Sequence, residues 1–364
     1  PFISLSLIAE GSPREIFADT DLFQQFMIRA PQVSQLGAQL KKAGHQLKVF
    51  PVTVEEARDG ISKALKDKPG KVVIKENGRK SSPEAGETVI TVDHLDFTYQ
   101  PLNVRAVKDV SFQIHKGEFV ALIGQNGSGK TTVLKNLLGL LKPTTGSVVV
   151  AGLDTSKAAV ADMARHVGFV LQNPDQQLFA ETVEEEISYG PRNLGLDKDV
   201  IAARVEMALK QVGLEDKRLE FPPALSKGDR AKTVIASALA LDPEVIVLDE
   251  PTTGQDYRGC HQIMQIADAL HDQGRTVVFV THHMALVAEY ARRVIVMTGG
   301  KILMDDSTRN VFNQPDIVRQ AYIIPPHITE LGHSLPAALG LPRTPLAVKE
   351  LAVPILARLK NGKS

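Results

Sequence analysis

Cysteine, net charge and long apolar runs are scarce in this chain of 364 residues. Its single cysteine, Cys260, cannot form an internal disulfide, which favours a reducing compartment such as the cytoplasm and a role as a small core residue. Lysine and arginine total 42, as do aspartate and glutamate, so no overall charge favours nucleic acid or anionic lipid. No stretch reaches the roughly 18 to 20 apolar residues of a membrane-spanning helix, and the N-terminal stretch lacks a signal peptide's basic flank.

The remaining composition is that of an ordinary globular protein. Hydrophobic residues make up 43% of the chain and charged residues 23%, which allows a large buried core. At about 150 residues per domain, the length predicts two to three domains.

The beginning of the chain resembles its end. The segment IAEGSPREIFADTDLFQQFMIRAPQVSQLGAQL, from Ile8, matches LMDDSTRNVFNQPDIVRQAYIIPPHITELGHSL, from Leu303, with about ten identities in some 34 ungapped positions. After a slip of one residue, FPVTVEEA from Phe50 also resembles TPLAVKEL from Thr344. The alternative is that both ends merely carry unrelated amphipathic helices.

The repeat predicts the domain organisation. Residues 1–60 are interpreted as the tail of a preceding copy, and residues 89–364 as a complete second copy. The first residue is Pro1 rather than methionine, and together with the repeat this favours a piece of a longer protein. Between the copies, KDKPGKVVIKENGRKSSPEAGE is polar and has no sustained apolar period, so residues 61–88 are predicted to be a linker.

A glycine-rich loop follows a predicted buried strand. GEFVALIG runs directly into GQNGSGKTT, and VLKNLLGLL then has helical spacing, which is the context that a G-x-x-x-x-G-K-[ST] motif requires. Glycines let consecutive backbone amides approach phosphate oxygens at the positive end of the helix. A glycine turn before an ordinary helix is the alternative. The predicted ATP-binding residues are Gly124, Gln125, Asn126, Gly127, Ser128, Gly129, Lys130, Thr131 and Thr132.

Two of these residues have specific predicted roles. Lys130 can reach the β- and γ-phosphates, and the hydroxyl of Thr131 can ligate Mg²⁺. A second motif, EVIVLDEPTTGQD, ends a strand of four apolar residues with Asp249 and Glu250. An unpaired buried carboxylate is costly, so we expect Asp249 to hold Mg²⁺ through water and Glu250 to act as the general base. A plain polar strand end is the alternative.

With these motifs, residues 89–310 resemble the ABC ATPase family. The resemblance implies that Tyr99 stacks on adenine, that Gln172 senses Mg²⁺ and the attacking water, and that His282 contacts the γ-phosphate. It also implies that Asp256 communicates across a dimer of two ATPase copies. The alternatives are a core role for the tyrosine and a structural role for the histidine.

The fold implied by the resemblance is α/β. It consists of a P-loop NTPase core with an antiparallel β subdomain, an α-helical signature subdomain and a small C-terminal tail domain, here residues 311–364. In this reading Lys130, Gln172, Glu250 and His282 form the catalytic set.

The family's signature LSGGQ is replaced by LSKGD, from Leu225 to Asp229. Ser226 is predicted to cap a helix with Asp229 at its third position. The resemblance implies that Ser226 and Gly228 face ATP bound by the opposite copy, where Lys227 adds a flexible cation. We expect nucleotide binding to persist, and a regulatory half with little hydrolysis stays as an alternative.

The segment NPDQQLFAETVEEEISYGPRNLGL resembles the ATPases of energy-coupling-factor importers, which take up vitamins and nickel or cobalt. The resemblance implies that residues 173–179 receive the helices of an integral membrane coupling protein, with Asp175 as partner for an arginine. The alternative for this segment is a solvated loop before a helix capped by Thr182, with Glu185 at the third position.

The implied function is ATP hydrolysis that powers import of a small nutrient, at the cytoplasmic face of the membrane. The implied partners are a second ATPase half, the coupling protein and a substrate-binding membrane subunit, without nucleic acid. A non-transport ABC ATPase that acts on DNA or ribosomes is the further alternative, although such proteins usually carry coiled-coil, zinc or basic insertions.

Overall fold

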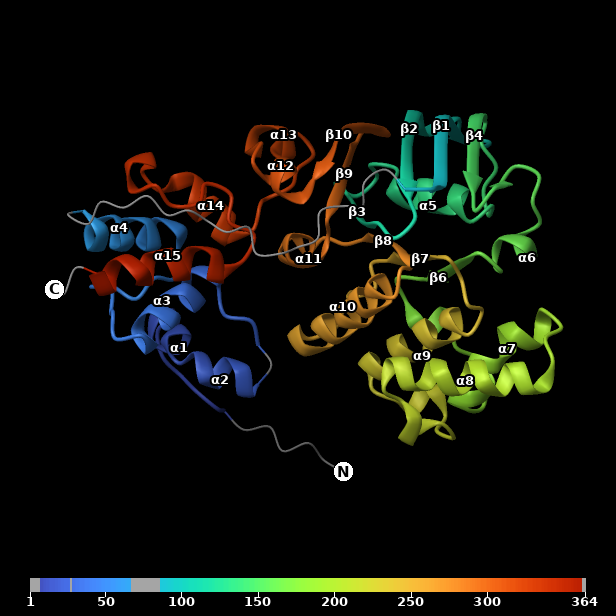
Figure 1. Ribbon diagram of the computed structural model, residues 1–364, viewed down its shortest axis with the longest axis horizontal. Coiled ribbons are helices and arrows are strands. Elements are labelled where there is room, and N and C mark those ends of the chain that lie inside the picture. The colour runs from blue at the N-terminus through green and yellow to red at the C-terminus, as the bar shows by residue number, and fades with distance from the viewer. Residues whose placement is uncertain (1–6, 27, 67–85, 362–364) are drawn as a thin grey trace. The chain divides into compact units, whose positions relative to one another are not determined.

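The computed structural model describes residues 7–26, 28–66 and 86–361. The chain divides into one compact unit formed by both of its ends, up to Arg79 and from Ile324, and a second unit of Lys80–Ile323 (Figure 1). No helix in the described ranges is long and apolar enough to cross a membrane.

A six-stranded sheet forms the centre of the second unit. Its strand order is β10-β9-β3-β8-β7-β6, in which β10 runs antiparallel to β9 and the other neighbours are parallel. All residues of β3, β7 and β8 are buried, as expected for parallel strands that are covered on both faces. The strands are β3 (Phe119–Ile123), β6 (Val167–Val170), β7 (Val245–Asp249), β8 (Thr276–Val280), β9 (Arg293–Thr298) and β10 (Lys301–Ser307).

A four-stranded antiparallel sheet completes the core of this unit. Its order is β2-β1-β4-β5, and its strands are β1 (Thr88–Tyr99), β2 (Val104–His115), β4 (Thr145–Val150) and β5 (Leu153–Asp154). Helix α5 (Lys130–Leu137) contacts β2, β4 and β7, so it links the two sheets. Apolar side chains from both sheets and from α5 share one hydrophobic core.

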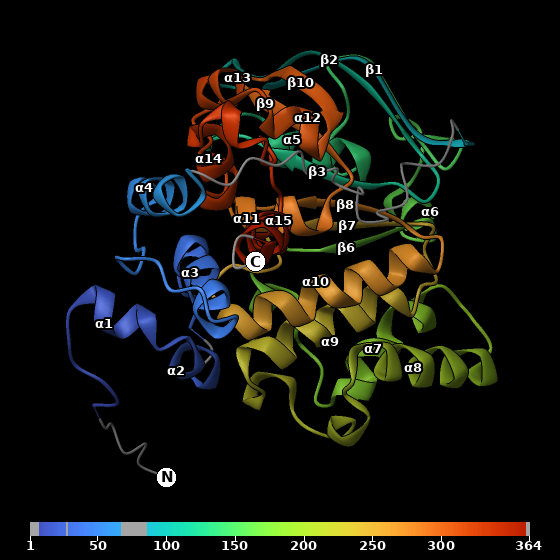
Figure 2. The ribbon, with the colours of Figure 1, turned by 60° about the vertical axis from the view of Figure 1, so that its left-hand side comes forward.

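Helices form the rest of the second unit (Figure 2). Helix α7 (Val183–Asn193) contacts α8 (Lys198–Val212) and α9 (Lys227–Leu239), and these three form the predicted helical subdomain. Cys260 is buried and forms no disulfide within the described residues, as the sequence predicts. The two sheets and these helices together confirm the predicted α/β fold class. The other helices are α6 (Val160–Met163), α10 (Tyr257–Asp272), α11 (Met284–Tyr290), α12 (Thr308–Phe312) and α13 (Pro315–Gln320).

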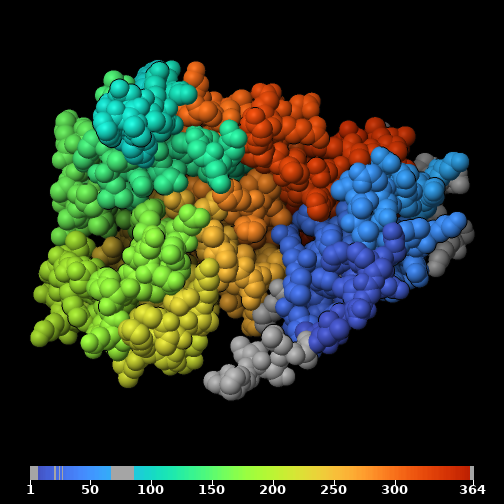
Figure 3. Space-filling model, turned by 180° about the vertical axis from the view of Figure 1, so that it is seen from behind, coloured from blue at the N-terminus to red at the C-terminus, as the bar shows by residue number. Residues whose placement is uncertain are grey.

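The first unit combines segments from both ends of the chain, coloured blue and red in Figure 3. Helices α3 and α4 share one core with α14 and α15, in which Leu36 and Ile61 are buried with Leu331 and Leu351. The helices of this unit are α1 (Pro13–Ala18), α2 (Thr20–Gln25), α3 (Gln32–Lys42), α4 (Val54–Leu65), α14 (His327–Ser334) and α15 (Val348–Asn361).

The two end segments that resemble each other in sequence also make matching hydrogen bonds. Ser34 Oγ donates to the carbonyl of Pro51 at 2.8 Å, and Thr329 Oγ1 donates to the carbonyl of Pro345 at 2.6 Å. Each segment also has a glutamate whose carboxylate accepts from the backbone amide four residues before it. Glu56 accepts from Val52 at 2.8 Å, and Glu350 accepts from Leu346 at 3.2 Å. Each end therefore folds in the same local way.

The structure shifts two of the predicted boundaries. Helix α4 continues to Leu65 because Ile61 and Leu65 are buried in the core, so the first part of the predicted linker at 61–88 is helical. Most of that linker, residues 67–85, lies outside the described residues. The tail predicted at 311–364 begins later, since α12 and α13 belong to the second unit, which ends at Ile323.

Candidate functional site

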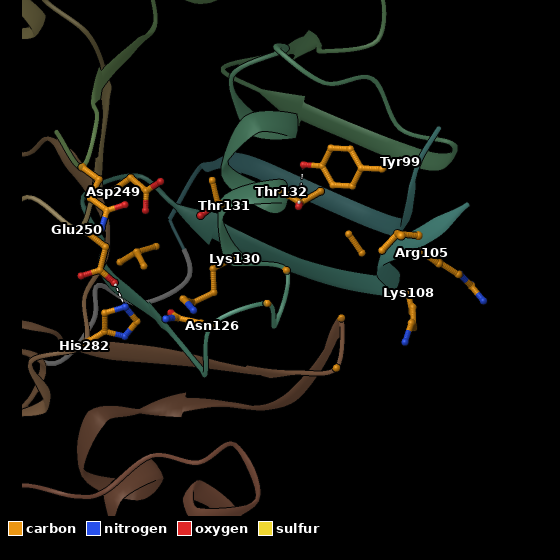
Figure 4. A pocket seen from close by; sticks show the side chains of 18 residues that line it. Tyr99, Arg105, Lys108, Asn126, Lys130, Thr131, Thr132, Asp249, Glu250 and His282 are labelled. Atoms are coloured by element: carbon orange, nitrogen blue, oxygen red, sulfur yellow. Dashed lines mark hydrogen bonds and ion pairs between the residues drawn. The ribbon is translucent and has the colours of Figure 1, made fainter. Parts of the chain in front are cut away.

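A pocket of about 600 Å³ lies where the two sheets of the second unit meet the loop between β3 and α5 (Figure 4). It gathers predicted residues from β1, the glycine loop and the ends of β6, β7 and β8. The predicted residues that line it are Tyr99, Asn126, Gly127, Gly129, Lys130, Thr131, Thr132, Gln172, Asp249, Glu250 and His282.

The glycine loop has a backbone that side chains would disrupt. Gly124 and Gly129 have φ angles of 152° and 102°, which L-residues rarely adopt. A Cβ atom on Gly124 would lie 2.2 Å from the carbonyl oxygen of Met297, and one on Gly129 would lie 2.6 Å from that of Ala106. Both glycines therefore allow the loop to pack against neighbouring strands and to place its amides at the start of α5.

Lys130 is buried at the inner wall of the pocket. Its Nζ donates to the carbonyl oxygens of Gly124 at 2.8 Å and Gln125 at 3.0 Å. Burial lowers the pKa of Lys130, while the nearby charges of Glu250 and Asp249 oppose that shift. The amino group of Lys130 thus lies at the pocket wall, where it can contact an anionic ligand.

The end of β7 brings two carboxylates into the pocket. Both are buried, since the exposed fractions of Asp249 and Glu250 are only 6% and 5%. Burial raises the pKa of Asp249, and it raises the pKa of Glu250 to about 7. Glu250 also has a φ angle of 52°, a left-handed conformation that is strained for a glutamate and persists mainly at functional sites. A carboxylate with a pKa near neutrality is suited to general base catalysis.

His282 faces Glu250 from the end of β8. Its Nε2 lies 2.9 Å from Oε1 of Glu250. Burial, and then the charge of Lys130, lower the pKa of His282, so the imidazole is mainly neutral near pH 7. The backbone amide of His282 also donates a hydrogen bond to the Glu250 carboxylate, which opposes the rise of its pKa.

The remaining pocket residues provide oxygen donors. Thr131 donates a side-chain hydrogen bond to Asp249, and the amide of Gln172 lines the same wall. Hydroxyl, carboxylate and amide oxygens are ligands that Mg²⁺ accepts. Within the described ranges, no group of three or more His, Cys, Asp or Glu side chains could hold a metal.

Tyr99 lies at the end of the pocket away from the carboxylates (Figure 4). Its hydroxyl lies 3.2 Å from Oγ1 of Thr132, and its ring packs edge-to-face against Phe97. The ring is partly exposed, as a surface for stacking a planar base requires.

Several predicted residues lie elsewhere in the chain. Gly124, Gln125 and Ser128 belong to the glycine loop but do not line the pocket. Ser226 caps α9 as predicted, with its side chain accepting from the amide of Asp229 at 3.2 Å. The chain does not bring Ser226, Gly228 or Asp256 into the pocket.

Asp256 instead caps α10, accepting from the amide of Gly259 at 2.6 Å. Lys227 extends over the loop that precedes α10. A Cβ atom on Gly254 would lie 2.1 Å from Nζ of Lys227, and Gln255 Nε2 donates to the carbonyl of Lys227 at 3.2 Å. The signature helix is therefore tied to this loop within one chain.

The segment at residues 173–179 adjoins a second pocket of about 260 Å³, lined by Gln177, Glu186, Tyr189 and residues of β6 and α9, most of them apolar. Phe179 is 62% exposed and packs edge-to-face on Tyr189. Asp175 has an internal arginine partner, because its Oδ1 lies 3.1 Å from Nε of Arg230. Thr182 caps α7 as the alternative interpretation predicts, since it accepts from the amide of Glu185 at 3.2 Å.

Some pocket residues were missed by sequence reasoning. Arg105 and Lys108 line the pocket from β2, and Gly299 and Gly300 line it from the turn between β9 and β10. They belong to no phosphate-binding motif, and only the packing of these elements against the glycine loop brings them there. The paired glycines between two strands were the available signal.

Comparison with known sequences identifies relatives. The ABC transporter family profile matches residues 107–253. The energy-coupling factor transporter ATP-binding protein EcfA1 of Methanospirillum hungatei is 39% identical over 248 residues, which cover 68% of this chain and 89% of that protein. An ABC transporter ATP-binding protein of Caldanaerobacter subterraneus is 39% identical over 339 residues, and the match spans 90% of this chain but only 58% of that protein.

Solved structures give a consistent result. The structure of cbiO1 from Clostridium perfringens, described as part of the ABC transporter complex cbiONQ, matches with a TM-score of 0.59 and 32% identity over 67% of this chain and 98% of that one. A dimeric ATP-binding cassette in a post-hydrolysis state with ADP and Pi matches with a TM-score of 0.55 and 28% identity, covering 60% of this chain and 99% of that one. The chain therefore belongs to the ABC transporter ATPase family, and within that family it is similar to the energy-coupling factor transporter ATP-binding proteins.

Proposed function

We propose that this chain binds MgATP in the 600 Å³ pocket and hydrolyses it to power import of a small nutrient, a vitamin or a transition-metal ion, through a membrane complex. The observation that carries the proposal is the meeting of Lys130, Asp249, Glu250 and His282 in one pocket, although three separate segments supply them. The glycine loop and Lys130 can bind the phosphates, and Glu250, whose pKa is about 7, can act as general base. These are the groups that phosphoryl transfer to water needs.

We propose a role for each group in the pocket. The amides of the loop and Lys130 neutralise charge on the phosphates, and Glu250 accepts the proton of the attacking water. His282 holds the Glu250 carboxylate in its orientation from 2.9 Å. Thr131, Gln172 and Asp249 would hold Mg²⁺, which supplies further charge neutralisation at the phosphates.

A second ATPase half is the first proposed partner. Ser226, Gly228 and Asp256 lie outside the chain's own pocket, which supports their action on ATP bound by another copy. The solved cassette with ADP and Pi is a dimer. The matching hydrogen bonds of the two end segments, and a relative of which this chain spans 58%, support a tandem protein whose first copy contributes residues 1–60.

The proposed membrane partners are an integral coupling protein and a substrate-binding subunit, with this chain peripheral at the cytoplasmic face. Similarity to EcfA1, and to a member of the cbiONQ complex, supports import over a role on DNA or ribosomes. The second pocket, with exposed Phe179 beside it, supports docking of the coupling protein at residues 173–179. Nucleic acid is not among the proposed partners.

One specific observation favours a second candidate function. Lys227, in the LSKGD segment, places its amino group beside Gly254. A cation at this position would suit a regulatory half that binds ATP but hardly hydrolyses it. Calorimetry with MgATP and single-turnover phosphate release on the full chain separate the two functions. If Lys130→Ala weakens MgATP affinity at least about tenfold, or about 1.4 kcal/mol, this supports nucleotide binding in the pocket. Binding without release in a single turnover would leave only the regulatory function.

A further inference from the structure

Three cationic side chains of lysine and arginine line the nucleotide pocket, and their charges are compensated differently. Lys130 lies near the charges of Asp249 and Glu250. Arg105 is paired with Asp96, with Nε 2.6 Å from Oδ1. Lys108 forms no ion pair in the part of the chain that the structure describes, so its charge is available to a ligand.

The backbone around Lys108 is fixed against the glycine loop. The amide of Lys108 donates to the carbonyl of Gly300 at 2.8 Å, and the amide of Gly300 donates to the carbonyl of Ser128 at 3.1 Å. Cβ atoms built on Gly129 and Gly300 would lie only 2.6 Å and 2.7 Å from the carbonyl oxygen of Ala106. These close contacts leave β2 little freedom to move relative to the loop that binds phosphate.

Lys108 also has a stem that packs on this support. Its Cγ lies 3.4 Å from the position of a Cβ on Gly300, and the residue as a whole is half-buried. Packing of the stem limits the positions that the ammonium can reach. Figure 4 shows Lys108 and Arg105 on β2, on the side of the pocket opposite to Asp249 and Glu250.

A nucleoside polyphosphate carries more negative charge than one lysine neutralises. Lys130 supplies positive charge near the carboxylates of Asp249 and Glu250. Towards Tyr99, the cationic side chain without an ion pair among the described residues is Lys108. We infer that Lys108 is a second phosphate-binding lysine, which holds the phosphates nearer the sugar of a nucleoside di- or triphosphate. The inference rests on the proposed function and adds a positioning residue that lies outside the glycine loop.

The test is calorimetry of MgATP and MgADP with the full chain and three variants. Lys108→Met keeps the stem and removes the charge, Lys108→Arg keeps the charge, and Lys116→Met removes an exposed charge outside the pocket. Lys108→Met should weaken both nucleotides about five- to tenfold, whereas the other two variants should stay within about twofold. The difference should shrink at high salt, because the missing contact is ionic.

Two outcomes would overturn the inference while the proposed function stands. One is wild-type affinity in Lys108→Met, and the other is an equal loss in Lys108→Arg, which would mean that the packing of the stem matters and the charge does not. A wild-type chain that binds neither nucleotide would overturn the proposed function, and this inference with it.

Discussion

Nε2 of His282 lies 2.9 Å from a carboxylate oxygen of Glu250, although the two residues follow different strands, β8 and β7. These strands are parallel neighbours, so their carboxyl ends reach the same edge of the sheet. The contact places a mainly neutral imidazole against a carboxylate whose pKa is raised to about 7. Burial therefore shifts the two pKa values in opposite directions, up for the carboxyl group of Glu250 and down for the imidazole of His282.

Glu250→Gln should block hydrolysis while leaving MgATP binding within about twofold of wild type. The amide keeps the size of the side chain but cannot accept a proton from water, so phosphate release should fall by at least about a hundredfold. Because ATP then stays bound, the variant should accumulate an ATP-bound dimer in light scattering across a wide concentration range. A wild-type chain that is strictly monomeric, yet hydrolyses ATP at a rate per chain independent of concentration, would contradict the two-copy site.

Stability should depend on pH through Glu250. Its pKa rises from the usual 4.5 to about 7 on folding, so the folded state binds the proton more tightly than the unfolded state. The stabilising contribution is complete below pH 4.5 and is lost as the pH rises through 7. Glu250→Gln avoids this loss. The free energy of unfolding of the variant minus that of wild type should therefore be up to about 3 kcal/mol larger at pH 8 than at pH 4.5.

Urea unfolding at the two pH values measures this difference. Glu215→Gln removes an exposed carboxylate instead and should show no comparable change between the two pH values. Equal effects of the two substitutions would show that burial of Glu250 is not responsible.

Lys227→Gly should raise the steady-state hydrolysis rate at saturating MgATP by about two- to fivefold. The substitution restores the family's glycine and removes the ammonium from its position over Gly254, so the helix N-terminus can approach phosphate with bare backbone. Binding of MgATP by the isolated chain should stay within about twofold, because Lys227 lies outside the chain's own pocket. Lys210→Ala, which removes an exposed lysine on α8, is the matched control, and equal rates in all three proteins would refute a restraining role for Lys227.

Asp175→Arg should release the chain from membranes that contain its coupling protein. The new arginine would face Arg230, whose Nε now lies 3.1 Å from the Asp175 carboxylate, and the repulsion should displace the segment at residues 173–179. MgATP affinity should be unchanged. Co-purification from membranes measures the effect, with Asp199→Arg on the exposed face of α8 as the control for added charge. Undiminished co-purification of the Asp175 variant would remove the main support for docking at this segment.

Local sequence was enough to predict which segments form most of the pocket wall. Gly124 to Thr132 and Asp249 with Glu250 each follow a buried strand, and carboxyl ends of parallel strands meet at one edge of an open sheet. The cap of α9 by Ser226 was also predictable, because a cap depends on residues within one turn. These features need only contacts between residues close in sequence, or a fixed rule for parallel strands.

The tertiary structure alone decided the rest. Lys108 enters the pocket because β2 packs on the glycine loop, and the partner of Asp175 is Arg230 because α9 lies beside the segment at residues 173–179. Sequence similarity between the two ends did not reveal that Leu36 and Leu331 share one core. Each of these contacts joins residues far apart in the chain, and their side chains fit many partners equally well until the fold brings one of them within reach.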